Sequence, residues 1–165
     1  MSGLRIRDYD ASLAGDFARI NRQWIEEMYA LEPVDEAQLA DPHGQIVAPG
    51  GAVLFAEDEA LGIVGTCGLL KTSEGEFELI KMAVLPQARA RGAGEALLRA
   101  AIARAFALSA TRLFLLTNSK SQAAIRLYER NGFVHDAEVL ARCGGEYSRC
   151  DVAMRYIGEG ATAAS

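Results

Sequence analysis

Several kinds of residue are scarce in this chain of 165 residues. It has three cysteines, two histidines and one tryptophan, and aromatic residues make up 7% of it. Cys67, Cys143 and Cys150 are an odd number without the spacing of a metal site, so we expect reduced thiols rather than a disulfide framework. The isolated His43 and His135 belong to no ligand cluster, so we expect no bound metal.

Two further absences narrow the class of protein. Arg99 and Arg104 interrupt the longest apolar run before it reaches the length of a membrane span, and the polar N-terminus does not have the pattern of a signal peptide. The formal net charge of −5 disfavours general attraction to nucleic acid or to an anionic membrane. We therefore expect a cytoplasmic protein that binds neither nucleic acid nor membrane.

The patterns that are present alternate between strand and helix. We expect one domain over 1–157 and a flexible tail over 158–165. The order of elements, a β-meander followed by two βα units, predicts an α/β fold with a mixed sheet and helices on both faces. The expected elements are a first strand over 4–6, helices from Asp10 or Ser12 to Leu31 and from Asp35 to Leu39, a loop over 41–51, strands over 51–58, 62–71 and 76–85, a helix after Gly92, a strand over 111–117, a helix over 119–130, and closing strands over 133–141 and 149–157.

The stretch from Glu76 to Gly94 is the most informative. A strand ends at Pro86 and leads through a loop with arginines and glycines into a helix. The first turn of a helix has unpaired N–H groups and the positive end of the helix dipole, which together bind phosphate. Gly92 and Gly94 let a ligand approach the backbone closely, and Arg89 and Arg91 add positive charge beside it. This pattern predicts a site for a small anionic ligand.

Two motifs resemble those of the GNAT superfamily of N-acetyltransferases. The acetyl-coenzyme A signature of the family is Arg or Gln, two residues, Gly, one residue, then Gly or Ala. A second signature is an Asn before a helix that ends in Tyr, followed by Gly-Phe. The residues that match them are Arg89, Ala90, Arg91, Gly92, Ala93 and Gly94 for the first and Asn118, Tyr128, Gly132 and Phe133 for the second. Many members have Gly at the position of Ala90 and a bulky aliphatic residue at that of Ala93.

The resemblance covers 4–157 and implies an N-acetyltransferase that uses acetyl-CoA and no metal. In the family, the pantetheine arm pairs with a bulged strand that corresponds to Met82, Ala83 and Val84 here. The first motif, with Asn118 and Tyr128, would complete the cofactor site. A backbone N–H, expected to be that of Val84, would polarise the acetyl carbonyl.

Two residues are candidates for proton transfer. Glu78 shares one face of an alternating strand with Ile80, Met82 and Val84, where desolvation raises the proton affinity of a carboxylate and suits it to act as a base. The alternative is a solvated or ion-paired residue at a strand end. Tyr128 has a phenol that can protonate the departing thiolate, although its position also fits a core tyrosine. Asn118 can bond a cofactor amide or cap the helix that follows.

The acceptor is expected to be the primary amine of a small molecule or peptide. Tyr29, Glu32 and Asp35 follow the first helix, where the family usually builds its acceptor site, and could favour a cationic amine. An exposed acidic turn is the alternative. The closing strands could also pair between two subunits in a homodimer. A second class of function, an acyl-CoA-binding sensor that performs no transfer, stays open at this stage.

Overall fold

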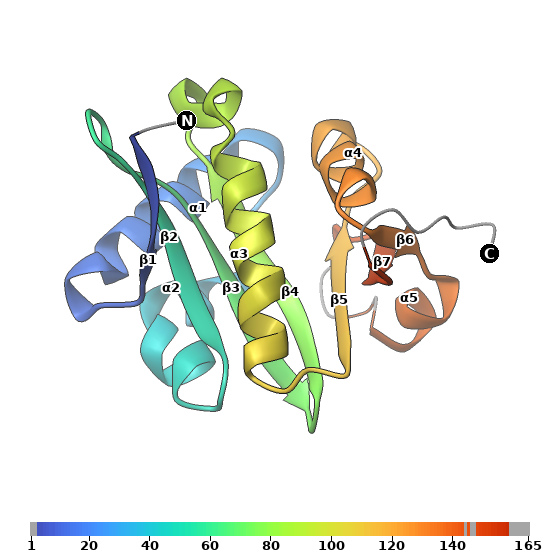
Figure 1. Ribbon diagram of the computed structural model, residues 1–165. Helices are drawn as coiled ribbons and strands as arrows, with labels where there is room; N and C mark the ends of the chain where they lie inside the picture. The colour runs from blue at the N-terminus through green and yellow to red at the C-terminus, as the bar shows by residue number, and fades with distance from the viewer. Residues whose placement is uncertain (1–2, 144, 146–147, 159–165) are drawn as a thin grey trace.

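The described residues form a seven-stranded sheet in the order β1-β2-β3-β4-β5-β7-β6 (Figure 1). The structure is a computed structural model that describes residues 3–143, 145 and 148–158. β4 and β5 run parallel, and the other neighbouring pairs are antiparallel, which confirms the predicted mixed sheet. The predicted tail over 158–165 lies outside the described residues apart from Gly158. The strands are β1 (Leu4–Asp8), β2 (Ala52–Asp58), β3 (Gly62–Ser73), β4 (Glu76–Val84), β5 (Arg112–Thr117), β6 (Phe133–His135) and β7 (Val152–Tyr156).

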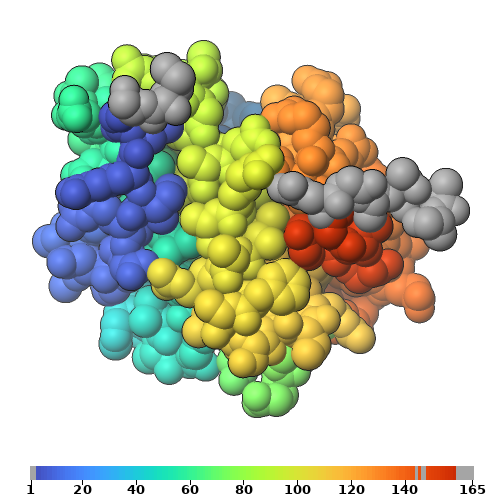
Figure 2. Space-filling model, viewed as in Figure 1, coloured from blue at the N-terminus to red at the C-terminus, as the bar shows by residue number. Residues whose placement is uncertain are grey.

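Helices cover both faces of the sheet. In Figure 1, α3 (Ala93–Ala107) and α4 (Gln122–Arg130) lie in front of it, and α1 (Ala14–Met28) and α2 (Pro33–Ala40) lie behind. Figure 2 shows α3 as a continuous yellow-green band between the N-terminal elements and those that follow β5. Among the described helices, none has the length and apolarity that crossing a membrane requires.

The core is divided by the sheet. On the α3 side, buried residues of α3 and α4 pack against β2 to β5, among them Leu97, Leu98 and Leu115. On the α1 side, Phe17 and Phe55 belong to a second buried cluster. Alternation along each strand sends neighbouring side chains to opposite clusters, which is why these strands are apolar on both faces.

The sheet forks between β4 and β5. The two strands pair only from Glu76 to Leu79 on β4 and from Arg112 to Leu115 on β5, although β4 continues to Val84. Among the described residues, no strand therefore pairs with the backbone groups of β4 beyond Leu79 on the β5 side. An unpaired strand edge at the fork is a template for an extended ligand.

A β-bulge lies in the unpaired part of β4. Gly68 of β3 pairs with Ile80 and Thr66 pairs with Ala83, so two residues of β4 lie opposite the single residue between them. The first of the two, Lys81, has a φ of 54°. The bulge makes the expected alternation wrong beyond Ile80, because Ile80 belongs to the cluster on the α1 side and Met82 packs against the cluster on the α3 side.

The strand predicted over 133–141 is wrong. β6 ends at His135, and α5 (Ala137–Cys143) follows it. The Asp136 carboxylate accepts hydrogen bonds from the N–H groups of Glu138 at 2.9 Å and Val139 at 3.1 Å, which starts the helix. Val139 then packs against Phe114, on the opposite face of β5 from the α3 cluster.

The segment after α1 also differs from the prediction. α1 ends at Met28, and Pro33 begins α2 rather than ending the first helix. Proline suits the first helical position because its missing N–H would have no partner there, and Glu32 precedes it as the N-cap. In the segment predicted as loop over 41–51, His43–Val47 form a helical turn, η2.

Gly51 offers a test of the packing between η2 and the sheet. A Cβ at Gly51 would lie 2.0 Å from the carbonyl oxygen of Leu69 and 2.7 Å from that of Ile46. Because backbone atoms cannot move aside, we expect Gly51→Ala to lower the free energy of unfolding by about 1–3 kcal/mol. Gly15→Ala in α1 is the matched control, since no described residue beyond its neighbours in the helix lies within 4 Å of its Cβ position, and it should stabilise by up to about 1 kcal/mol. Urea denaturation measures both, and a Gly51→Ala protein as stable as the wild type would contradict the packing described.

Candidate active site

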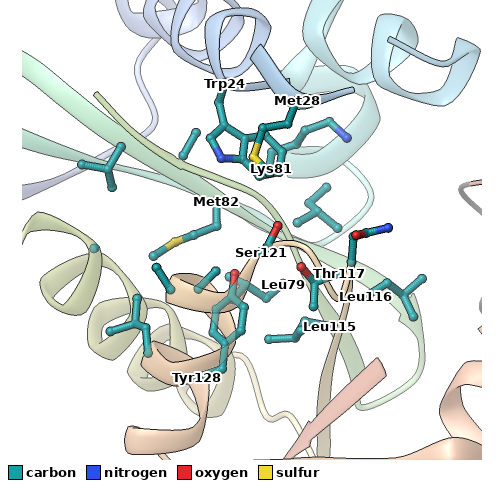
Figure 3. Close-up of a pocket in the computed structure, with 18 of the residues that line it drawn as sticks. Trp24, Met28, Leu79, Lys81, Met82, Leu115, Leu116, Thr117, Ser121 and Tyr128 are labelled. Atoms are coloured by element: carbon teal, nitrogen blue, oxygen red, sulfur yellow. The ribbon is translucent and has the colours of Figure 1, made fainter. Parts of the chain in front are cut away.

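The fork opens into a cleft of about 520 Å³. Its walls come from the end of α1, the unpaired part of β4, the start of α3, the end of β5 and α4. Figure 3 shows Trp24 and Met28 reaching it from α1 and Tyr128 from α4, with Leu79 and Met82 of β4 between them. Elements far apart in the sequence therefore meet where the two strands separate.

One end of the cleft lies at the predicted phosphate loop. Arg89, Gly92 and Gly94 line it. Gly92 has a φ of 82°, in the left-handed region, and precedes α3 without a side-chain cap, so the first N–H groups of α3 are available to an anion. The Arg89 Nε donates to the carbonyl oxygen of Val84 at 3.1 Å, and an Arg89 Nη nitrogen lies 3.7 Å from a Glu27 oxygen of α1.

The other residues of the first motif point elsewhere. Arg91 forms an ion pair with Asp58 at 2.5 Å, Ala93 is completely buried in the core, and Ala90 is exposed. None of these three lines the cleft. The side chains of Arg91 and Ala93 thus stabilise the fold around the loop, and any contact of these three residues with the ligand would come from their backbone groups.

Val84 presents its backbone to the cleft. The N–H of Leu85 donates to the carbonyl oxygen of Val64 on β3 at 2.8 Å. Because consecutive N–H groups of a strand point in opposite directions, the Val84 N–H points away from β3. The contact between Arg89 and the Val84 carbonyl oxygen, on the same side, agrees with this direction. Met82 and Ala83 also line the cleft.

Tyr128 is a buried residue of α4 at the edge of the cleft. It lines the cleft while only 6% of it is exposed, and its ring packs against Phe133 with the centroids 5.9 Å apart. Figure 3 shows its hydroxyl directed toward Met82 and Ser121. Burial, with a smaller effect of Cys67, raises the pKa of the phenol above its usual value, so the hydroxyl keeps its proton over the whole neutral range.

Glu78 lies in the wall of the cleft on β4 and is 1% exposed. This burial excludes the solvated alternative. Lys81 and Cys150 are close enough to interact electrostatically with its carboxylate. Burial is the main reason why the pKa of the Cys150 thiol rises to about 11, and the charge of Glu78 adds to it.

A buried ionic network lies behind Glu78. The Lys81 Nζ donates to Asp35 Oδ1 at 2.6 Å, and the Arg149 guanidinium binds both oxygens of Asp35 at 2.7 and 2.9 Å. Arg149 also reaches Glu32 at 3.1 Å. Burial alone would raise the pKa of Asp35, but the hydrogen bonds from Arg149, Lys81 and the Glu32 N–H outweigh it and lower that pKa to about 2. Asp35 is therefore ionised at any pH at which the protein works.

Of the three residues predicted to bind the acceptor, only Tyr29 lines the cleft. Tyr29 lines the cleft and its hydroxyl lies 3.2 Å from Ser121 Oγ. Lys120 and Arg149 each have a charged group 5.9 Å from the centre of its ring. Glu32 and Asp35 do not line the cleft, and the network uses both carboxylates. The alternative of an exposed acidic turn is wrong for Asp35, which is completely buried.

Asn118 lines the cleft at the end of β5. Its side-chain nitrogen donates to the Arg149 carbonyl oxygen, and its side-chain oxygen accepts from the Lys120 N–H at 2.8 Å. The N-cap of α4 is Ser121, so the interpretation of Asn118 as the helix cap is wrong. Asn118 instead joins the end of β5 to the segment that supplies Arg149.

Reasoning from the sequence did not identify two residues of the ionic network beside the cleft, Lys81 and Arg149. Lys81 stands in the apolar strand EFELIKMAV, and this position of a lysine was the one available signal. Arg149 gave no comparable signal, because its partners lie more than a hundred residues earlier in the chain.

Known proteins resemble this chain over most of its length. The family model described as the acetyltransferase (GNAT) family matches residues 15–133. YjgM of Escherichia coli, described as an uncharacterized N-acetyltransferase, is 33% identical over 144 residues, which cover 83% of this chain and 84% of that protein. Rv2669 of Mycobacterium tuberculosis, with the same description, is 32% identical over 109 residues, or 66% of this chain and 69% of that protein.

Solved structures share the fold at low sequence identity. An acetyltransferase of the GNAT family from Staphylococcus aureus has a TM-score of 0.83 at 20% identity and covers 93% of this chain and 98% of its own. The protein yncA from Salmonella typhimurium, solved with its cofactor acetyl-CoA, has a TM-score of 0.73 at 19% identity, with 98% and 97% covered. The sheet, its fork and the family match together show that this chain belongs to the GNAT family of acetyltransferases.

Proposed function

We propose that the chain transfers the acetyl group of acetyl-CoA to a primary amine by direct attack within a ternary complex. The observation that carries this proposal is a single cleft that joins three features: uncapped helical N–H groups at Gly92, an unpaired strand edge on β4, and the buried pair Glu78 and Tyr128. Each feature suits one part of acetyl-CoA or one step of its reaction.

The cofactor would lie along the fork. Its diphosphate would accept hydrogen bonds from the first N–H groups of α3, with Arg89 beside them. Its pantetheine arm would follow the unpaired edge of β4 at Met82, Ala83 and Val84, as an added strand does. This order leads the thioester along the cleft toward Glu78 and Tyr128.

The residues present support a complete reaction. Glu78 would take a proton from the ammonium form of the acceptor, and the free amine would attack the thioester carbonyl carbon. The Val84 N–H would stabilise the negative charge that develops on the carbonyl oxygen. When the carbon–sulfur bond breaks, Tyr128 would give its proton to the thiolate, and the second proton that the attacking nitrogen loses would restore the phenol. The products would be an amide and coenzyme A. Because burial raises the pKa of Tyr128, the phenol is protonated before the reaction, as a proton donor must be.

The cysteines support direct attack over a covalent acetyl-enzyme. Cys150 lines the cleft, but burial raises its pKa to about 11, so little thiolate forms near neutral pH. Cys67 is completely buried in the core, and burial raises its pKa to about 12. Neither thiol is prepared to accept an acetyl group.

The amine would enter between α1 and the segment around Arg149. Trp24, Met28 and Tyr29 form an apolar and aromatic wall there. Because Arg149 and Lys81 neutralise Glu32 and Asp35, these two carboxylates do not supply free negative charge for a cation. Packing against the aromatic wall and proton transfer to Glu78 would then select the acceptor, which we take to be a primary amine of a small molecule or peptide.

Cofactor binding is tested at Arg89. We expect Arg89→Ala to weaken the affinity for acetyl-CoA by about ten-fold to a hundred-fold, because a hydrogen bond to a charged group contributes about 1.5–3 kcal/mol. Arg19→Ala is the control, since Arg19 is an exposed residue of α1 that pairs with Asp16, and it should leave the affinity unchanged. Isothermal titration measures both. A wild-type protein that does not bind acetyl-CoA at millimolar concentration would overturn the proposed function.

The proton-transfer roles are tested by Glu78→Gln and Tyr128→Phe. Each should lower kcat for a responsive amine by about a hundred-fold or more, while the affinity for acetyl-CoA stays close to that of the wild type. Tyr9→Phe is the control for loss of a phenol outside the cleft. Release of coenzyme A over a panel of amines measures turnover. Unchanged turnover in either variant rejects that role, and binding of acetyl-CoA without turnover of any amine would favour an acyl-CoA sensor.

A further inference from the structure

The bulge of β4 depends on a strained lysine. Lys81 has a φ of 54°, in the left-handed region. For a residue with a Cβ, the population of this region is about ten-fold or more below that of its ordinary conformations, whereas glycine adopts it freely. Something in the surroundings must therefore hold Lys81 in this conformation.

The side chain of Lys81 supplies that hold. It is 2% exposed, and its Nζ lies 2.6 Å from an oxygen of Asp35, which is completely buried. A buried ammonium group needs its partner, because an unpaired charge in the interior is strongly unfavourable. The left-handed conformation is thus linked to the ion pair.

The partner of Lys81 is itself fixed from the other side of the fork. Asp35 binds both terminal nitrogens of Arg149, and the Arg149 carbonyl oxygen accepts a hydrogen bond from Asn118 at the end of β5. A continuous chain of polar contacts thus runs from β4 through Asp35 and Arg149 to β5. It connects the two strands where their backbone pairing has stopped.

The bulge decides which groups of β4 meet in the cleft. Glu78 lies before it, and the Val84 N–H lies after it. Side chains and N–H groups both alternate in direction along a strand. One extra residue between Glu78 and Val84 therefore reverses the direction of the Val84 N–H relative to the Glu78 side chain. If β4 had no bulge and Glu78 still lay in the cleft, the Val84 N–H would point toward β3 and away from the cleft.

We propose that Lys81 is a positioning residue, whose buried ion pair with Asp35 holds the bulge and so brings Glu78 and the Val84 N–H into the same cleft. The proposal rests on the acetyl transfer proposed above. It assigns no direct contact with the substrate to Lys81.

The test compares Lys81→Ala with Lys81→Gly. Both variants lose the ion pair. Alanine has a Cβ and still pays the energetic cost of a positive φ, whereas glycine does not. We expect Lys81→Ala to lower kcat/KM by about a hundred-fold, as a small misplacement of reacting groups does. Glycine should recover about ten-fold of that loss. Lys71→Ala on β3 is the control, because Lys71 pairs with the exposed Glu74, and it should have wild-type turnover.

The activities of these variants distinguish failure of the positioning role of Lys81 from failure of acetyl transfer. If the wild type turns over an amine but Lys81→Gly is no more active than Lys81→Ala, or Lys81→Ala keeps wild-type activity, the positioning role is rejected and acetyl transfer stands. If the wild type neither binds acetyl-CoA nor turns over, acetyl transfer itself fails.

A second pair of variants covers the case in which Lys81→Ala does not fold. Asp35→Asn keeps the size of the side chain and removes its charge. The double variant Asp35→Asn, Lys81→Gly should then have a kcat/KM about ten-fold above that of Asp35→Asn alone. Equal turnover of Asp35→Asn and the double variant rejects the positioning role, whereas a general loss of stability would lower both without any recovery by glycine.

Discussion

The separation of β4 from β5 is the constraint on which the rest of the structure depends. The two parallel strands pair over four residues each and then diverge. Within the part of the chain that the structure describes, this leaves polar backbone groups of β4 without a partner strand at the centre of the sheet. Such groups are stable only if water or a ligand satisfies them. The fork therefore creates both the space and the hydrogen-bonding edge that an extended cofactor needs, while two core clusters pack against the faces of the sheet.

Charged residues are buried around this fork in a way that stability alone does not require. Lys81, Asp35 and Arg149 form a network in which each charge has an opposite partner. Apolar side chains of the same size would often be as stable. A network of fixed length, however, defines the distance between the elements that it joins. In this chain it joins β4, α2 and the segment bonded to the end of β5, and these elements surround the proposed reaction centre.

The sequence predicted the parts of the fold that depend on local patterns. The hairpin of β2 and β3 and the helix after Gly92 follow from turn residues and apolar periodicity, and all three are present. The strand expected over 133–141 was wrong because the Asp136 cap, which starts α5, outweighs the strand propensity of a few apolar residues. Within the site, Arg89 and Tyr128 were identified from short motifs. Lys81 and Arg149 were not, because their role depends on contacts between distant segments, which no local pattern records.

The most direct test of this account is a crystal structure of the protein with coenzyme A. We predict a diphosphate bound by the backbone N–H groups at Gly92 to Gly94 and a pantetheine arm paired with β4, with its sulfur between the Val84 N–H and the Tyr128 hydroxyl. Coenzyme A bound outside the fork, or an empty turn before α3 at saturating ligand, would contradict it.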